Sequence, residues 1–266
     1  MKPVQESERP PIAAYVQQNQ PDGVPPLELT GERTLPDVPA ENYWFRRHLA
    51  VYEWISARVA GQHVLDMACG EGYGSDVLAR TAASVVGLDA NPDAHEHARM
   101  RYRRPNLTFE RGMVENFGQP GQFGAVVFLQ TIEHVQDPEA VLAHIRRLLS
   151  PGGVAYISTP NVLTLAPEGQ SKSDNPWHIK EYRATEFRQL CGSVFDQVEL
   201  LGLFHARKLR AHAAALALGW DGVHRRLGLT ERFYDWFTPA ISARDFALRP
   251  DRLDAALDFL GICRGA

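Results

Sequence analysis

The fold is indicated most clearly by the stretch Val64-Leu65-Asp66-Met67-Ala68-Cys69-Gly70-Glu71-Gly72-Tyr73-Gly74. The stretch opens within the apolar run 63–67, which predicts a short buried strand. Glycines then stand at alternate positions, where they let the backbone turn tightly and approach a ligand closely. A helical pattern follows from Ser75. A loop placed between a strand and a helix in this way lies at the usual ligand crevice of a doubly wound sheet.

The spacing of the glycines distinguishes this loop from a dinucleotide-binding loop. Gly70, Gly72 and Gly74 form G-x-G-x-G, whereas the dinucleotide fingerprint is G-x-G-x-x-G with a pyrophosphate at the helix N-terminus. Asp66 would repel a pyrophosphate, but it suits a ligand that carries an ammonium and a sulfonium. Asp89 ends the next predicted strand, where a carboxylate accepts hydrogen bonds from ribose hydroxyls. Together these residues predict a nucleoside-type cofactor.

Strands and helices alternate along most of the chain. The ranges that predict strands are 63–67, 84–89, 107–110, 124–129, 154–158, 197–201 and 257–263. Helices are predicted over 41–59, from 75, over 92–102 and over 138–149. This alternation is typical of a parallel sheet with helices on both faces. We therefore expect an α/β fold with a doubly wound, seven-stranded, mostly parallel sheet and a helical lid insert.

The predicted organisation has five parts. Residues 1–29 are rich in Pro, Gln and Glu and are expected to form a disordered tail. Residues 30–60 form an N-terminal helical cap, and residues 61–202 form the cofactor-binding core. Residues 203–256 form a lid or substrate insert, and residues 257–266 return as the final core strand.

Composition narrows the class of protein. The 266 residues are 44% hydrophobic and carry a net charge of −4, which predicts a globular protein without a general attraction to nucleic acid. Three widely spaced cysteines match no metal pattern and favour a reducing compartment. No signal segment or apolar run of membrane-spanning length is evident, so we expect a cytoplasmic protein. The aromatic residues of the insert suggest a homodimer.

The loop, Asp89 and the segment Gly112-Met113-Val114-Glu115 together resemble the class I S-adenosylmethionine-dependent methyltransferases over about residues 30–203. The resemblance implies a Rossmann-like methyltransferase fold and methyl transfer from S-adenosylmethionine, which leaves S-adenosylhomocysteine. Met113 stands where the family often has aspartate, so packing by Met113 and the backbone amide of Val114 would hold the adenine. The cofactor-binding residues that the resemblance implies are Asp66, Ala68, Cys69, Gly70, Gly72, Asp89, Ala90, Met113, Val114 and Gln130.

Two residues of the N-terminal cap are further candidates for cofactor binding. Tyr43 and Arg47 precede the loop and would cover it. The guanidinium of Arg47 would pair with the methionine carboxylate of the cofactor. An alternative is that the neighbouring Trp44 only anchors this helix to the sheet.

The segment Gln130-Thr131-Ile132-Glu133-His134 follows the fourth predicted strand, and His178 lies farther along the chain. Q-x-x-E-H with a distant histidine resembles the E-x-x-E-H and distant histidine of small-RNA 2′-O-methyltransferases, whose four side chains hold a divalent metal. The resemblance implies Gln130, Glu133, His134 and His178 as ligands of Mg²⁺ or Mn²⁺, although an amide oxygen is a weaker ligand than a carboxylate. A hydroxyl acceptor needs a base or a metal. Glu133, His134 and His178 are therefore the catalytic candidates, with His134 as the base; ordinary pocket or loop roles for the histidines remain open.

Short segments elsewhere resemble actinobacterial methyltransferases of methylated-polysaccharide synthesis. These segments are 29–34, 41–48, 70–74, 158–161 and 202–205. The resemblance implies a sugar hydroxyl, in a mono- or oligosaccharide, as acceptor. It weakens after about Arg210, within the insert whose aromatic residues would either stack on a sugar or form the insert's own core: Trp220, Phe233, Tyr234, Trp236 and Phe237.

Three alternatives to a sugar acceptor stay open. The first is a small molecule such as a quinone, polyketide or lipid hydroxyl. The second is an RNA 2′-hydroxyl, which the acidic net charge opposes. The third is a cofactor-binding regulator without catalysis, which the Glu133-His134 pair opposes.

Overall fold

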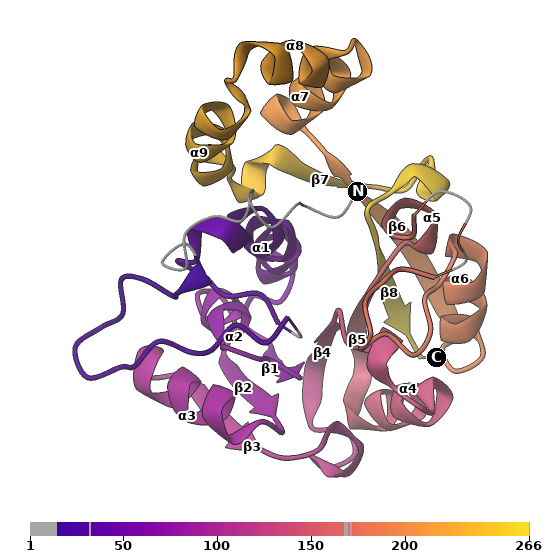
Figure 1. The fold of residues 1–266 in the computed structure, drawn as a ribbon. Coiled ribbons are helices and arrows are strands. Elements are labelled where there is room, and N and C mark those ends of the chain that lie inside the picture. Colours follow the sequence, from indigo (N-terminus) through magenta and orange to yellow (C-terminus); the bar gives the residue numbers. More distant parts are fainter. Residues whose placement is uncertain (1–14, 32, 168–169, 171, 266) are drawn as a thin grey trace. The chain divides into compact units, whose positions relative to one another are not determined.

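The computed structural model describes residues 15–31, 33–167, 170 and 172–265 (Figure 1). The chain divides into two compact units. The first consists of Met1–Val51 and His205–Ala247, and the second of Tyr52–Phe204 and Leu248–Ala266. The predicted boundaries of the insert, 203 and 256, differ from these because the chain after Ala247 rejoins the second unit.

An eight-stranded sheet organises the fold, in the order β3-β2-β1-β4-β5-β8-β6-β7. The strands β1 to β5 pair in parallel, and β8 pairs antiparallel with both β5 and β6. Their bounds are His63–Met67 (β1), Ser84–Asp89 (β2), Leu107–Arg111 (β3), Phe123–Leu129 (β4), Leu149–Pro160 (β5), Gln197–His205 (β6), Phe246–Arg249 (β7) and Asp258–Arg264 (β8). The predicted α/β, mostly parallel fold is confirmed.

The sheet has one strand more than the seven predicted. The additional strand, β7, is only four residues long. It follows a helical stretch of the chain. Its four residues, Phe-Ala-Leu-Arg, are too few to show the alternating apolar pattern that identifies a strand.

Helices connect the strands in the second unit, and Figure 1 shows α3 beside β2 and β3, with α4 beside β5. The bounds are Tyr73–Leu78 (α2), Pro92–Arg101 (α3), Pro138–Leu148 (α4), Val162–Leu165 (α5) and Ala184–Gly192 (α6). The side chain of Asn91 accepts hydrogen bonds from the amides of Asp93 and Ala94 and so caps α3. Asp137 caps α4 through the amide of Ala140. In both helices a proline occupies the first turn, where its missing amide hydrogen and its fixed φ angle suit the start of a helix.

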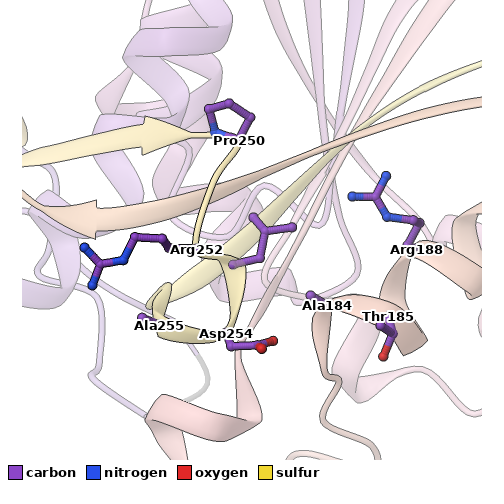
Figure 2. Close-up of a pocket in the computed structure, with 8 residues that line it drawn as sticks. Ala184, Thr185, Arg188, Pro250, Arg252, Asp254 and Ala255 are labelled. Carbon is purple, nitrogen blue, oxygen red and sulfur yellow. The ribbon is translucent and has the colours of Figure 1, made fainter.

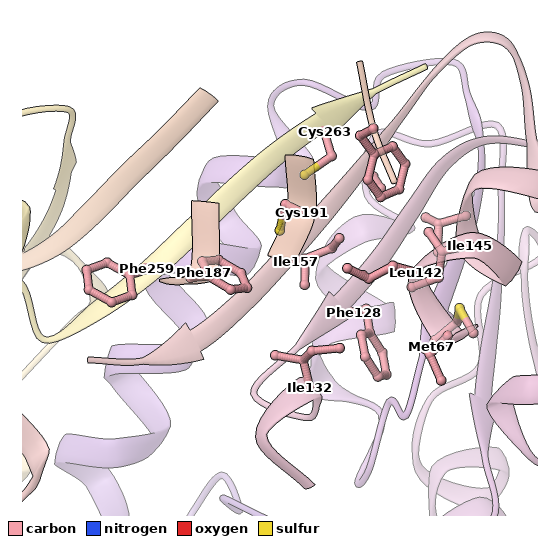
Figure 3. Close-up of a cluster of buried hydrophobic side chains, with 14 of the residues drawn as sticks. Met67, Phe128, Ile132, Leu142, Ile145, Ile157, Phe187, Cys191, Phe259 and Cys263 are labelled. Atoms are coloured by element: carbon pink, nitrogen blue, oxygen red, sulfur yellow. The ribbon is translucent and has the colours of Figure 1, made fainter. Parts of the chain in front are cut away.

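The main hydrophobic core lies where α4 and α6 pack on the central strands (Figure 3). Phe128 and Ile157 come from β4 and β5, Leu142 from α4 and Phe187 from α6, and all four side chains are fully buried. Burial on this scale makes the carboxyl end of β4 a rigid support for the residues that follow it.

The first unit contains the start of α1 (Asn42–Ser56) and the helices α7 (Arg207–Ala217), α8 (Trp220–Leu227) and α9 (Thr230–Ala240). Phe233 and Phe237 stack with their ring centroids 5.1 Å apart, and His212 lies 4.7 Å from Phe237. These rings form a core of the insert itself. Trp236, in contrast, is 70% exposed.

The N-terminal residues differ in part from the mobile tail that we expected. Residues 1–14 lie outside the described part of the chain. From Tyr15 the backbone is mostly irregular, yet Gln17, Val24 and Leu27 are buried. The amide of Leu27 donates to Oε1 of Gln17 at 3.0 Å, which anchors this segment locally. Nowhere in the described chain is there a helix with the length and apolarity that a bilayer crossing requires.

Candidate active site

The loop between β1 and α2 depends on a strained and crowded backbone. Ala68, Gly70 and Gly72 have φ angles of 56°, 57° and 95°, in the left-handed region that glycine adopts most easily. A Cβ atom at Gly72 would lie 2.8 Å from Cβ of Ala98, and one at Gly74 would lie 2.2 Å from Cζ of Tyr52. Glycine is therefore required at 72 by backbone conformation and by neighbouring side chains, and at 74 by the ring of Tyr52.

Asp66 lies beneath this loop and is fully buried. Its carboxylate accepts hydrogen bonds from Oγ of Ser75 at 2.6 Å and from the hydroxyl of Tyr52 at 3.1 Å. Burial raises the pKa of Asp66 to about 7, although the two hydrogen bonds act in the opposite direction. These contacts give Asp66 a role in holding the loop; its attraction for the ammonium of a cofactor stays a prediction.

Asp89 joins the loop to the end of β2. Its Oδ2 accepts a hydrogen bond from the amide of Gly70 at 2.7 Å, and its Oδ1 accepts one from the amide of Asn91 at 2.9 Å. A carboxylate offers about four acceptor positions, so two backbone bonds leave capacity for hydroxyl donors. The amide of Cys69 adds a further tie, since it donates to the carbonyl of Leu88 at 2.9 Å. The structure thus brings Asp89 to the loop, as the sequence predicts.

Glu71 is a residue of the loop to which the sequence assigned no role. Its buried carboxylate accepts hydrogen bonds from Tyr102 at 2.7 Å and contacts Nε2 of His97 at 3.0 Å. A guanidinium nitrogen of Arg101 lies 3.2 Å away. Glu71 therefore fixes the outer side of the loop to α3. The local sequence contains no signal for this cluster, because its members lie at least 26 residues from Glu71.

The predicted adenine residues lie next to Asp89. The amide of Gly112 donates to the carbonyl of Asp89 at 3.1 Å, which places Met113 directly beside this strand end. The side chain of Met113 is 56% exposed, whereas Val114 packs partly against the core. Ala90 is exposed. An exposed thioether beside a carboxylate offers an apolar surface for a ring.

Gln130 follows β4 in the left-handed conformation, with φ of 49°. Its amide donates to the carbonyl of Ser158 at 3.1 Å, and its Nε2 donates to Oγ of Ser158 at 2.9 Å. Both bonds tie Gln130 to β5. Tyr43 and Arg47 belong to the first unit, where the hydroxyl of Tyr43 lies 2.7 Å from Nε2 of His205. Their contact with a cofactor stays a prediction.

Glu133 lies in the turn Ile132–His134 and is 1% exposed. The hydroxyl of Thr159 donates to its Oε2 at 3.1 Å. Burial, together with the nearby carboxylates of Asp258 and Glu181, raises the pKa of Glu133 to about 8 against the opposing effect of the hydrogen bonds. A buried carboxyl at this position is neutral at pH 7 unless a cation compensates its charge.

The hydrogen bonds of His134 define its tautomer. Its Nδ1 lies 2.9 Å from the carbonyl oxygen of Trp177. A carbonyl only accepts, so Nδ1 carries the proton and donates. The neutral ring then presents Nε2 with a lone pair, as a base or a metal ligand requires. The ring of His134 is half-buried, so part of it is accessible to solvent.

His178 is held more tightly than His134. Its Nδ1 lies 2.7 Å from Oε1 of Glu181, and its Nε2 lies 3.0 Å from Nδ2 of Asn175. The orientation of the Asn175 amide is fixed because its Oδ1 accepts from the amide of Trp177. Asn175 therefore donates to Nε2 of His178, and the lone pair of this nitrogen is already engaged. Glu181 is a second residue that the sequence did not assign.

These groups come together around Glu133. The amides of Ile179 and Lys180 donate to its carbonyl oxygen at 2.8 and 3.2 Å, which clamps the segment with His178 against the turn. The rings of His134 and His178 have centroids 5.0 Å apart. Ligand atoms of Glu133, His134 and His178 all lie within 4.8 Å of one another. Three of the four predicted metal-binding residues are thus close enough to act on one ion or one hydroxyl.

Comparisons with known proteins identify the family of the chain. Residues 41–213 match the family model described as a methyltransferase domain. The chain is 41% identical over 185 residues to a probable S-adenosylmethionine-dependent methyltransferase of Mycolicibacterium smegmatis, which covers 69% of this chain and 71% of the relative. It is 34% identical over 164 residues to a ubiquinone biosynthesis O-methyltransferase of Albidiferax ferrireducens, over 53% of this chain and 63% of the relative.

Solved structures show the same fold. A Thermotoga maritima S-adenosylmethionine-dependent methyltransferase, described as a possible histamine N-methyltransferase, has a TM-score of 0.57 at 14% identity, over 85% of this chain and 94% of its own. The [4+2]-cyclase SpnF has a TM-score of 0.52 at 17% identity, over 90% of this chain and 86% of its own. Because the family model spans more than half of the chain and includes both the glycine loop and Glu133-His134, the chain belongs to the methyltransferase domain family and is a methyltransferase.

Proposed function

We propose that this enzyme transfers a methyl group from S-adenosylmethionine to a sugar hydroxyl, in a mono- or oligosaccharide, with His134 as the general base. The names of the relatives favour this donor. When bound, the donor supplies a methyl group on a positively charged sulfur. The observation that carries the proposal is the hydrogen bond between Nδ1 of His134, which follows β4, and the carbonyl of Trp177, because it assigns the proton of the neutral ring to Nδ1.

The residues of the second unit fit such a donor. The left-handed turns at Ala68 and Gly70 bring backbone close to the crevice, and Asp89 retains acceptor capacity for two ribose hydroxyls. Met113 offers an exposed apolar side chain beside Asp89, which suits packing against adenine. These residues would hold the donor by shape, hydrogen bonds and ring packing.

Catalysis by this chain requires a proton acceptor, because a sugar hydroxyl is hardly ionised at neutral pH. Nε2 of His134 takes the hydroxyl proton as the oxygen is methylated. The ring becomes an imidazolium, and its Nδ1–H bond to the carbonyl of Trp177 stabilises that charge and keeps the ring oriented. Nδ1 cannot serve as the base, since it carries the proton in this bond.

A sugar is favoured over a quinol by the polar groups around His134. Trp177 is 50% exposed, whereas its backbone carbonyl accepts the hydrogen bond from His134. An exposed aromatic ring in a rigid segment is a platform on which the apolar face of a sugar can pack. Gln130 and Asn175 place amide groups near the same turn, which suits an acceptor rich in hydroxyls.

The experiment is transfer of labelled methyl groups to a panel of acceptors. The panel contains mono-, di- and oligosaccharides together with quinols and hydroxylated lipids. We expect saccharides to be methylated, and His134→Ala to lower kcat by about 10²–10⁴-fold while donor affinity stays unchanged. His63→Ala is the matched control, because His63 is an exposed histidine at the amino end of β1, whereas the glycine loop follows the carboxyl end. Methylation of quinols or lipids alone contradicts the sugar acceptor, and full turnover by His134→Ala contradicts the base.

A divalent cation is a second candidate for activating the hydroxyl. It is favoured by the spacing of Glu133, His134 and His178, whose ligand atoms lie within 4.8 Å. A cation such as Mg²⁺ or Mn²⁺ would act as a Lewis acid and would compensate the buried charge of Glu133. His178 would first have to release the hydrogen bond from Asn175.

Metal binding is tested separately from activity. Titration of Mn²⁺ into chelator-treated enzyme, followed by electron paramagnetic resonance, measures binding directly. We expect bound Mn²⁺ in the wild type and much weaker binding in Glu133→Gln, since an amide replaces the carboxylate. Undetectable binding together with full activity after EDTA treatment would rule the metal out.

A further inference from the structure

The second unit contains a pocket that shares no lining residue with the site around Glu133. It measures about 460 Å³, within the range of roughly 300–1,000 Å³ that is usual for small-molecule sites. One wall is the start of α6, and the other is the turn between β7 and β8 (Figure 2). The lining residues are Ala184, Thr185, Arg188, Pro250, Arg252, Leu253, Asp254 and Ala255.

Charged side chains of opposite sign line this pocket. Figure 2 shows Arg188 extending from α6 towards the turn that carries Asp254, whereas Arg252 extends away. The side chains of Arg188 and Asp254 are both exposed, and within the described part of the chain neither has a hydrogen bond or an ion pair. They do not pair with each other, so a ligand between them can accept from the guanidinium and donate to the carboxylate. Pro250 and Leu253 supply apolar surface in the same pocket.

The position of the pocket connects it to the acceptor side of the active site. Asn161 follows β5, and its Nδ2 donates to the carbonyls of Asp254 at 3.1 Å and Ala256 at 2.8 Å. The other wall is fixed to the same strand end, because the amide of Val162 donates to the carbonyl of Tyr182, two residues before α6. The carboxyl end of β5 pairs with that of β4, which leads to Glu133. Both walls of the pocket are therefore tied to the end of the strand that neighbours β4, and neighbouring strands lie about 4.8 Å apart.

We propose that this pocket is a second saccharide subsite, which holds a neighbouring sugar residue of an oligosaccharide acceptor while the reacting hydroxyl lies at His134. The inference rests on the proposed function. Saccharide hydroxyls both donate and accept, so one ring can satisfy Asp254 and Arg188 together while its apolar face packs on Leu253.

The test is the dependence of methyl transfer on acceptor length. Transfer to a mono-, di- and trisaccharide series is measured for the wild type, Arg188→Ala and Asp254→Asn. Arg103→Ala is the matched control, since Arg103 is an exposed arginine outside the pocket. We expect kcat/KM for the longer acceptors to fall about tenfold or more in both pocket variants, as for loss of a charged hydrogen bond. Transfer to the monosaccharide should stay unchanged.

A second readout measures binding without turnover. Saturation-transfer NMR of the trisaccharide with enzyme loaded with S-adenosylhomocysteine should show weaker contact for the pocket variants, whose thermal unfolding should match that of the wild type. Equal behaviour of all variants towards long and short acceptors overturns the subsite and leaves the proposed function standing. A wild-type enzyme that methylates no saccharide of any length overturns both.

Discussion

Glu133→Gln is the substitution that separates the effects of burial from those of catalysis at this site. The side chain is 1% exposed, its pKa is raised to about 8 by burial, and its Oε2 accepts a hydrogen bond from Thr159. Glutamine has nearly the same shape and still offers an oxygen to Thr159. It lacks the ionisable proton, so the variant removes the cost of a buried charge and keeps the packing.

The size of the effect follows from the two pKa values of Glu133. The pKa is 4.5 for the ordinary side chain and about 8 in the folded protein. The folded state therefore holds more protons than the unfolded state between these values, and the free energy of unfolding falls as the pH rises from 4.5 to 8. The difference between the two pKa values corresponds to a loss of at most about 5 kcal/mol in the free energy of unfolding. This loss is complete above pH 8 and absent below pH 4.5.

Denaturant unfolding of the wild type and Glu133→Gln at pH 4 and pH 8.5 measures this difference. We expect nearly equal stability at pH 4 and a more stable variant, by a few kcal/mol, at pH 8.5. Glu199→Gln is the matched control, because Glu199 is an exposed residue of β6, and it should change stability by less than about 0.5 kcal/mol at either pH.

One result would refute this reasoning. If Glu133→Gln is less stable than the wild type by the same amount at both pH values, the carboxylate of Glu133 is ionised and compensated in the folded protein. Added Mn²⁺ extends the assay: stabilisation of the wild type at pH 8.5, without stabilisation of Glu133→Gln, would assign the compensating charge to a bound cation.

Two further predictions concern the glycine loop. Gly74→Ala places a Cβ atom 2.2 Å from Cζ of Tyr52, so we expect a loss of about 1–3 kcal/mol in chemical unfolding, whereas Gly192→Ala, which meets nothing within 4 Å, should be close to neutral. Asp89→Asn replaces one of the two carboxylate oxygens, which accept from the amides of Gly70 and Asn91, with an amide nitrogen that cannot accept. Calorimetric titration with S-adenosylmethionine should therefore show binding that is weaker by about tenfold or more. Unchanged donor affinity would remove Asp89 from the cofactor site.

Much of the fold was predictable because its signals are local. The strand His63–Met67 and the strand Ser84–Asp89 have the bounds that their apolar runs predict. The caps Asn91 and Asp137 start α3 and α4 because each satisfies amide groups within its own first turn. The strand β7 escaped prediction because its four residues form a strand only through pairing within the sheet.

The sequence by itself determined the glycine spacing, the position of Asp89 at a strand end and the segment Gln130 to His134, because each of these depends on neighbouring residues in the chain. Only the tertiary structure decided which nitrogen of His134 carries the proton, since that depends on the carbonyl of Trp177, 43 residues away. It also decided the environment of Glu133, whose pKa depends on burial and on the distant Asp258. The glycine loop is a local signal, whereas the protonation of His134 and Glu133 is set by contacts with residues far along the chain.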